Sequence, residues 1–170
     1  IELNAKFNLR DKIQERAFAA YMKAKWNIGM LSLGCGIGKS FIAIKIMEQI
    51  SKKTVILVDE IYLAKQWCNY ILENTDLPPE KLVMVHSKMK KADKERIKTA
   101  SVIVASKDSL FGKAKLTNII KEDCGLLIID ETHVVAAKIF TEVAKEFDAK
   151  WILGLTASAE RDDGLSFQVH

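Results

Sequence analysis

The sequence predicts an α/β fold: a three-layer sandwich in which helices cover both faces of a mostly parallel sheet of about six to seven strands. Two observations support this class. Short runs of consecutive apolar, often β-branched residues recur along the 170-residue chain, and segments with helical spacing of apolar residues separate them. Strands that are apolar on both faces are typical of parallel sheets covered on both sides, and right-handed crossovers connect them.

Six apolar runs are the expected strands, and helices are expected between most of them. A first helix is expected after Asn8, which suits an N-cap with Asp11 at the third position. Its expected apolar face consists of Ile13, Ala17, Ala20, Tyr21 and Ala24. Further helices are expected over residues 39–51 and 63–72. The expected strands are residues 28–33, 54–58, 82–85, 101–105, 126–130 and 151–156.

Composition limits the class of protein further. Hydrophobic residues make up 49% of the chain and charged residues 28%, which suits a single domain over residues 1–170. No stretch reaches the ~18 consecutive apolar residues of a membrane span, and the first residues lack the order of a signal peptide. We therefore expect an intracellular protein with no membrane segment. Because the sequence begins at Ile1 rather than Met, we also expect a piece of a longer polypeptide or a processed product.

The cysteines and histidines predict neither a disulfide framework nor a metal cage. The three cysteines are widely spaced and include no C-x-x-C pair, so we expect reduced thiols. The three histidines are too scattered to form a metal site by their spacing. These residues are Cys35, Cys68, Cys124, His86, His133 and His170.

Basic residues are concentrated in one part of the chain. Residues 81–121 contain eleven Lys or Arg and three acidic residues, a net charge of +8 in a chain whose total is +4. Such a segment would attract a phosphate backbone, because neutralising phosphates releases counterions. A solvated lysine-rich face explains the same pattern, so charge alone leaves both interpretations open.

The segment G-C-G-I-G-K-S predicts a phosphate-binding loop, since it follows an expected strand and leads into an expected helix. Gly36 and Gly38 would let backbone N–H groups close around phosphates. Lys39 would reach the β- and γ-phosphates, and Ser40 would offer its hydroxyl to Mg²⁺. The common pattern G-x-x-x-x-G-K-[ST] has Gly at its first position, where this chain has Leu33.

A phosphate loop of this kind needs a second carboxylate at the end of a neighbouring strand. Two pairs compete, Asp59 with Glu60 and Asp130 with Glu131, and their local patterns are nearly equal. We assign Asp130 to Mg²⁺, largely through water, and Glu131 to the attacking water, because this pair opens the distinct motif D-E-T-H. We interpret Asp59 and Glu60 as part of a solvated loop or helix N-terminus, where the helix dipole favours acids.

The phosphate loop, the D-E-T-H motif and L-G-L-T-A-S-A-E-R-D-D-G at residues 153–164 resemble, in order and spacing, the first RecA-like lobe of a superfamily-2 DEAD/DEAH-type helicase or translocase. The chain looks most like the branch with XPB-like repair helicases, phage helicases and motor subunits of type I and type III restriction enzymes. The resemblance covers essentially the whole chain and implies a P-loop NTPase (RecA-like) fold. Ser158 and Ala159 depart from the usual L-T-A-T-P of the third motif.

The resemblance also implies roles for individual residues. Lys39, Asp130 and Glu131 are implied to be catalytic, and His133, Thr156 and Ser158 to couple the nucleotide site to a nucleic-acid path. Residues implied to contact the nucleotide are Gln14, Gly34, Cys35, Gly36, Ile37, Gly38, Lys39 and Ser40. Residues implied to contact one nucleic-acid strand, mainly its phosphates, are Lys65, Ser87, Lys88, Ser106 and Lys107.

The expected function is therefore that of a nucleic-acid-dependent ATPase lobe that uses ATP and Mg²⁺, with DNA favoured over RNA as its partner. The resemblance implies a second RecA-like lobe, absent from these 170 residues, that supplies arginines to the site. The alternatives are an ATP-binding scaffold lobe without unwinding activity and a fragment of a restriction-enzyme motor subunit. A GTPase would need an N/T-K-x-D element, and a small-molecule kinase a lid with clustered arginines; neither is present in the sequence.

Overall fold

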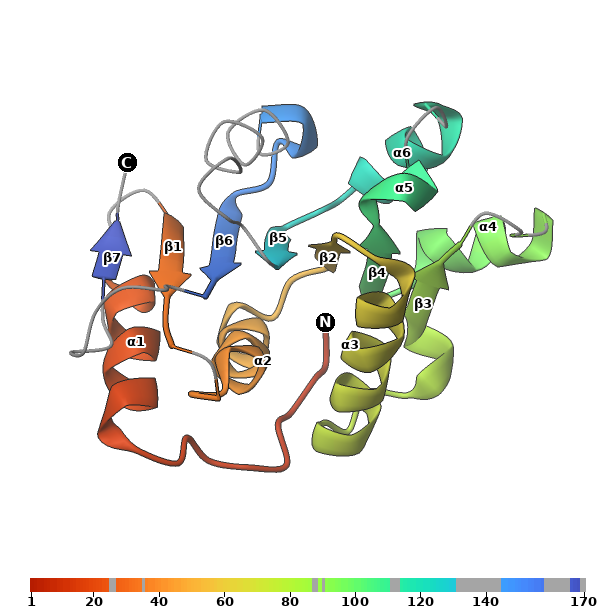
Figure 1. Cartoon of the computed structure of the whole chain (residues 1–170). Coiled ribbons are helices and arrows are strands. Elements are labelled where there is room, and N and C mark those ends of the chain that lie inside the picture. The colour runs from red at the N-terminus through yellow and green to blue at the C-terminus, as the bar shows by residue number, and fades with distance from the viewer. Residues whose placement is uncertain are drawn as a thin grey trace.

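The chain forms a seven-stranded sheet in the order β3-β4-β2-β5-β6-β1-β7 (Figure 1). The structure, a computed structural model, describes residues 1–24, 27–34, 36–86, 89, 91–110, 114–130, 145–157 and 166–168, with the backbone alone for 91–94, 108, 114–116 and 166–168. The strands are β1 (Ile28–Ser32), β2 (Thr54–Val58), β3 (Leu82–Val85), β4 (Val102–Ser106), β5 (Leu126–Asp130), β6 (Trp151–Thr156) and β7 (Ser166–Gln168). All neighbouring pairs are parallel except β1 and β7. The predicted α/β class and mostly parallel sheet are confirmed.

Helices cover both faces of the sheet, which gives the three expected layers (Figure 1). On one face lie α1 (Lys12–Met22), α2 (Lys39–Ile50) and α3 (Ile61–Asn74). On the other lie α4 (Lys91–Thr99) and α6 (Ala114–Lys121), while the short α5 (Lys107–Leu110) follows β4 directly and a 3-10 turn, Pro79–Lys81, precedes β3. No helix within the described ranges is long and apolar enough to cross a membrane.

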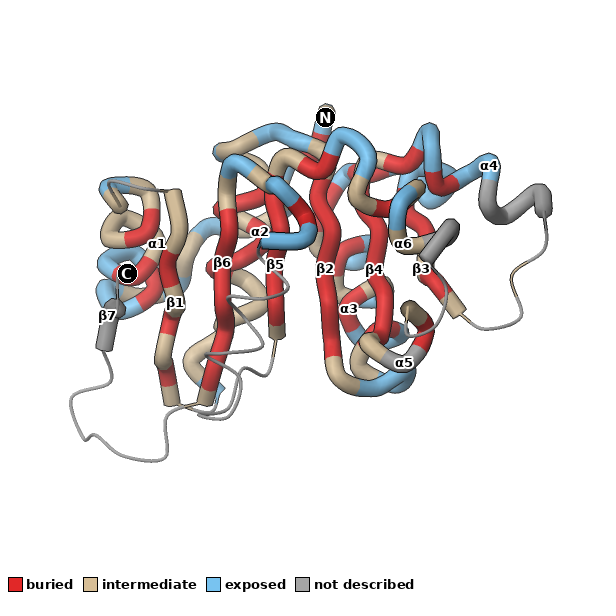
Figure 2. The backbone as a smooth tube through the Cα atoms, turned by 90° about the horizontal axis from the view of Figure 1, so that it is seen from above, coloured by how far each residue is buried: buried red, intermediate tan, exposed pale blue. Residues whose placement is uncertain are grey.

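The central strands divide their side chains between two cores. Along β2, Ile56 and Val58 pack toward α1, α2 and α3, whereas Val55 and Leu57 pack toward α4 and α6. All five residues of β2 and all five of β4 are buried, and the tube of the central strands in Figure 2 is correspondingly red. Burial on both faces explains why these strands are continuous apolar runs rather than alternating ones.

The start of α1 differs from the expectation in two ways. Asp11, not Asn8, is the N-cap: its carboxylate accepts hydrogen bonds from the backbone N–H groups of Ile13 and Gln14. A charged cap suits this place because it faces the positive end of the helix dipole. Ile13 is 38% exposed, and the polar Gln14 is buried beside Ala17 and Tyr21 in its place.

Candidate nucleotide-binding site

The expected nucleotide residues meet at the edge of the sheet where the parallel strands end. Ser32, the last residue of β1, pairs with Thr156 of β6, and the neighbouring Leu155 pairs with Asp130 of β5. The loop that follows β1, the carboxylate at the end of β5 and Thr156 of the third motif therefore lie along one edge. In open α/β sheets, ligands bind outside the carboxyl ends of the strands.

The segment expected to bind phosphate has, at its described residues, the backbone that its glycines predict. Gly36 and Gly38 have φ angles of +80° and +86°, which other residue types rarely adopt. Gly38 is the N-cap of α2, and its carbonyl accepts hydrogen bonds from the N–H groups of Phe41 and Ile42. Lys39 opens the helix, and its ammonium donates to the carbonyl of Leu33 at 3.2 Å, across the loop. Ser40 is half-buried in the same first turn.

Leu33 explains the departure from the common loop pattern. Its side chain is fully buried in the core beneath α1 and α2, and its N–H donates to the carbonyl of Thr156 at 3.2 Å. The residue thus continues the β1–β6 ladder by one step instead of starting the turn. A core side chain is needed here, so Leu stands where related loops have Gly.

This placement predicts that Leu33→Gly, although it restores the common pattern, destabilises the protein. Removal of a fully buried leucine side chain leaves a cavity, and the expected loss in free energy of unfolding is at least the ~2–5 kcal/mol of a Leu→Ala change. Urea denaturation measures it, with Leu72→Ala as the control because Leu72 is 37% exposed. Equal stability of Leu33→Gly and the unsubstituted chain would show that Leu33 is not a core residue.

Gln14 lies directly against the loop. Its amide Nε2 donates to the carbonyl of Ile37 at 2.7 Å, and its Oε1 accepts from the N–H of Arg10 at 2.7 Å. A Cβ added to Gly38 would lie 2.7 Å from the Gln14 Nε2, so the glycine also makes room for this side chain. Gln14 thus links α1 to the loop, and this bond explains why a polar residue is 3% exposed there.

Asp130 ends β5 on the face covered by α2 and α3, since Ile128, two residues earlier, packs into that core. One of its oxygens, Oδ2, accepts a hydrogen bond from the indole N–H of Trp67 at 2.7 Å. Trp67 belongs to the buried face of α3 with Ala64 and Ile71, and is 2% exposed. Sequence reasoning missed this residue; the available signal was its helical spacing with Ala64 and Ile71, because a buried indole N–H needs an acceptor.

The competing acidic pair, Asp59 and Glu60, takes no part in this arrangement among the contacts that the structure describes. Asp59 forms an ion pair with Lys107, which joins the end of β2 to the residue after β4. Glu60 is the N-cap of α3 by its backbone, with no capping bond from its side chain. Both observations agree with the interpretation of this pair as a loop and helix N-terminus.

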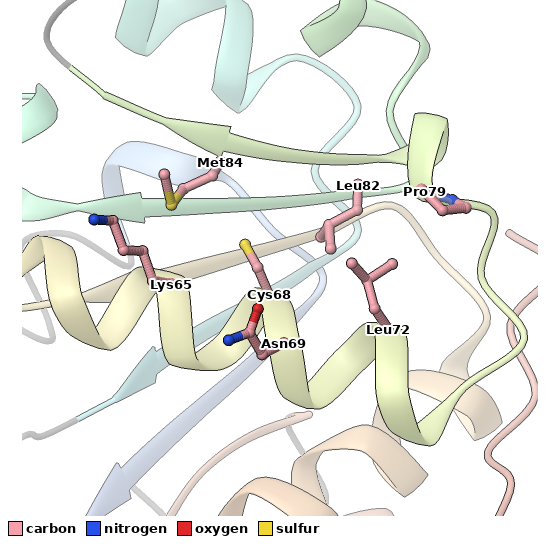
Figure 3. Close-up of a pocket in the computed structure, with 7 residues that line it drawn as sticks. All are labelled: Lys65, Cys68, Asn69, Leu72, Pro79, Leu82 and Met84. Atoms are coloured by element: carbon pink, nitrogen blue, oxygen red, sulfur yellow. The ribbon is translucent and has the colours of Figure 1, made fainter.

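The residues expected to contact a nucleic-acid strand are only partly brought together. Lys107 lies at the carboxyl edge but is paired with Asp59. Ser106 disagrees with the expectation: it is 2% exposed and its hydroxyl shares a 2.7 Å hydrogen bond with that of Ser109, so the side chain is buried among protein groups. Lys65 lies on the flank of the molecule, at a hollow of about 380 Å³ between α3 and β3 (Figure 3).

Six of the expected site residues lie outside the described residues. They are Cys35, Ser87, Lys88, Glu131, His133 and Ser158. Thr156, the remaining coupling residue, is 9% exposed at the end of β6, and its carbonyl accepts a hydrogen bond from the N–H of Leu33, the residue before the loop.

Part of the basic segment belongs to the opposite edge of the sheet. Lys81, Lys98 and Lys121 come just before β3, β4 and β5, so they lie at the amino ends of these strands. Lys98 pairs with Glu95 at 3.1 Å and Lys121 with Glu146 at 2.9 Å. The solvated-face interpretation holds for Lys81 and Lys98, which are exposed, whereas the Lys121 side chain is only 22% exposed.

Two of the cysteines have thiols that are unreactive near neutral pH. Burial raises the pKa of the Cys68 thiol to about 11 and that of Cys124 to about 12. Both are free, and both stay neutral near pH 7, where a thiolate would be needed for attack or for binding a metal.

The fold and the loop define a class of protein, the RecA-like lobe of a superfamily-2 helicase or translocase, and comparison with known proteins agrees. Residues 6–161 match the family described as "Type III restriction enzyme, res subunit", and the chain belongs to this family.

Individual relatives are similar over most of this chain. The "DNA 3'-5' helicase XPB" of Kineococcus radiotolerans is 30% identical over 82% of this chain and 25% of its own length. The "DNA 3'-5' translocase XPB2" of Sulfurisphaera tokodaii is 32% identical over 92% of this chain and 33% of its own length. The chain thus spans a quarter to a third of these relatives. Among solved structures, the Hef helicase domain of Pyrococcus furiosus has a TM-score of 0.69 at 25% identity, covering 87% of this chain and 32% of that one.

Proposed function

We propose that the chain is the ATP-binding lobe of a nucleic-acid-dependent helicase or translocase, and that MgATP binds in the loop between β1 and α2. The observation that supports this most is the pair of left-handed glycines, Gly36 and Gly38, directly before α2. Such a backbone forms a concave group of N–H donors, and the positive end of α2 favours an anion at the same place. Lys39, which now donates to the Leu33 carbonyl, would turn to the β- and γ-phosphates.

Magnesium fits the donors at this edge. In nucleotide enzymes Mg²⁺ is held by one or two carboxylates together with phosphates and water, not by a dedicated protein cage. Within the part of the chain that the structure describes, no three His, Cys, Asp or Glu side chains gather into a metal site. Ser40 and Asp130 would hold the ion, which would neutralise phosphate charge.

The remaining roles follow from the resemblance. Glu131 would orient the attacking water and accept its proton. Thr156, Ser158 and His133 would couple hydrolysis to movement along nucleic acid. The place of Thr156 suits this role, because its carbonyl pairs with the N–H of Leu33, the residue directly before the loop. Gln14 would position the nucleotide from beneath the loop, where the Ile37 carbonyl holds it.

The partner we propose is DNA, since the relatives named above are a DNA helicase and a DNA translocase. The strand would cross the carboxyl edge and be held mainly through phosphates, with little sequence preference. Lys107 would contribute once released from Asp59, and Lys65 of α3 would contribute as well. Ser87 and Lys88, which follow β3 in the sequence, are the further proposed contacts. The 170 residues form one lobe, and a second RecA-like lobe in the full-length polypeptide would complete the site.

Substitution of the loop lysine tests the nucleotide site. Lys39→Ala removes a charge that backbone N–H groups cannot replace, so the affinity for MgADP should fall by roughly 100-fold or more. Titration calorimetry on the 170-residue chain measures this affinity. Lys45→Ala is the matched control, because Lys45 lies on the same helix but pairs with Glu48. Unchanged MgADP affinity in Lys39→Ala would contradict the proposed site.

A further inference from the structure

We propose that Trp67 is a positioning residue for the magnesium carboxylate: its indole N–H holds Asp130 in the orientation that the ion requires. The inference rests on the proposed nucleotide site and adds to it a residue from a different part of the chain. Trp67 and Asp130 are 63 positions apart, and only the packing of α3 against the sheet brings them together.

The contact is short and well defined. The distance from Trp67 Nε1 to Asp130 Oδ2 is 2.7 Å, in the range of hydrogen bonds to an ionised acceptor, which are stronger than neutral ones. An indole N–H donates only and does not ionise near neutral pH, so it fixes one oxygen without neutralising the carboxylate. The negative charge that a cation needs is therefore preserved.

The indole itself cannot shift easily. Trp67 is 2% exposed in the core formed by α3 and the strands, and Ala64 and Ile71 lie on the same buried face of the helix. A side chain locked by packing holds its polar atom at one place, whereas a lysine or a water molecule could follow the carboxylate as it moved. Outer hydrogen bonds of this kind orient metal-binding carboxylates, and their loss typically costs ~10–100-fold in metal affinity.

The direction of the contact also suits this role. Asp130 emerges on the α2 and α3 face, the face from which the phosphate loop and Ser40 reach the edge. Trp67 approaches from the α3 side, and Ser40 lies at the start of α2. The indole thus restrains the carboxylate from α3, and Ser40 of α2 would hold the cation together with this carboxylate.

The test separates orientation of the carboxylate from simple core packing. Trp67→Phe keeps an aromatic ring and removes the N–H, and Trp151→Phe is the same change at a half-buried strand position beside Tyr21. Binding of a fluorescent ADP analogue to the 170-residue chain is measured against magnesium chloride concentration and in EDTA. We expect Trp67→Phe to raise the magnesium concentration at half-maximal binding by about tenfold or more, with binding in EDTA unchanged. Trp151→Phe should change neither.

Three outcomes are decisive against the inference or its basis. If Trp67→Phe leaves the magnesium dependence unaltered, or weakens binding of the analogue equally with and without magnesium, Trp67 is a core residue and not a positioning residue. Failure of the unsubstituted chain to bind the analogue at any magnesium concentration would instead refute the nucleotide site itself.

A second measurement applies even if Trp67→Phe unfolds. The double substitution Trp26→Phe and Trp151→Phe leaves Trp67 as the single tryptophan of the three in the sequence. With ADP present, the fluorescence emission of Trp67 should change as magnesium is added. The magnesium concentration at half of this change should equal the one at half-maximal binding. Constant emission while binding saturates would overturn the inference.

Discussion

Glu131→Gln should bind ATP about as tightly as the unsubstituted protein but lower its turnover by ~10²–10⁴-fold. The reason is that the carboxylate acts on the attacking water and contributes little to ground-state binding, whereas the amide cannot accept a proton. The measurement is ATP hydrolysis by the full-length protein, together with ATP affinity by calorimetry. Glu122→Gln, an exposed acid at the end of α6, is the control and should leave both quantities unchanged.

A normal rate in Glu131→Gln would move the catalytic assignment to the other acidic strand end. The contacts of that end argue against it, because Asp59 is paired with Lys107 and Glu60 is the N-cap of α3. Asp130 instead ends β5 and pairs with Leu155 of β6. β6 in turn pairs with β1, the strand before the loop.

The 170-residue chain alone should hydrolyse ATP at a rate ~10³–10⁵-fold lower than a polypeptide that carries both lobes. An arginine supplied from another unit stabilises transition-state charge in many P-loop enzymes, and the proposed second lobe would supply it here. Steady-state hydrolysis by the chain and by the two-lobed polypeptide, each with and without single-stranded DNA, measures the difference. Rapid, DNA-stimulated turnover by the chain alone would contradict the two-lobe mechanism.

Much of the fold follows from local sequence because the central strands are buried on both faces. The runs 54–58 and 126–130 are central strands with the predicted bounds, because continuous apolar residues over so short a length are typical of parallel strands covered on both faces. The edge strand 82–85 also has its predicted bounds. The first helix was predicted less well. Asn8 and Asp11 are both good caps, and the choice between them depends on how the preceding chain enters the helix, which neighbouring residues do not specify.

The backbone conformation of the loop before α2 could be predicted for a related reason: the glycines that allow the backbone to turn are visible in the sequence. That the loop binds phosphate stays a prediction. The tertiary contacts of the site could not be predicted. The Trp67–Asp130 hydrogen bond and the Asp59–Lys107 ion pair join residues 63 and 48 positions apart. Leu33 likewise looks like a defect in the motif until its burial is known.

The most direct test of the central claim is amide hydrogen exchange of the loop with and without MgADP. If phosphates are held by the backbone between β1 and α2, the amide protons of Gly36, Gly38, Lys39 and Ser40 should exchange markedly more slowly when MgADP is bound, and the amides of α4 and α6 should be unaffected. Binding of MgADP with no slowing at these four amides, or with protection elsewhere only, would contradict the proposal that this loop is the nucleotide site.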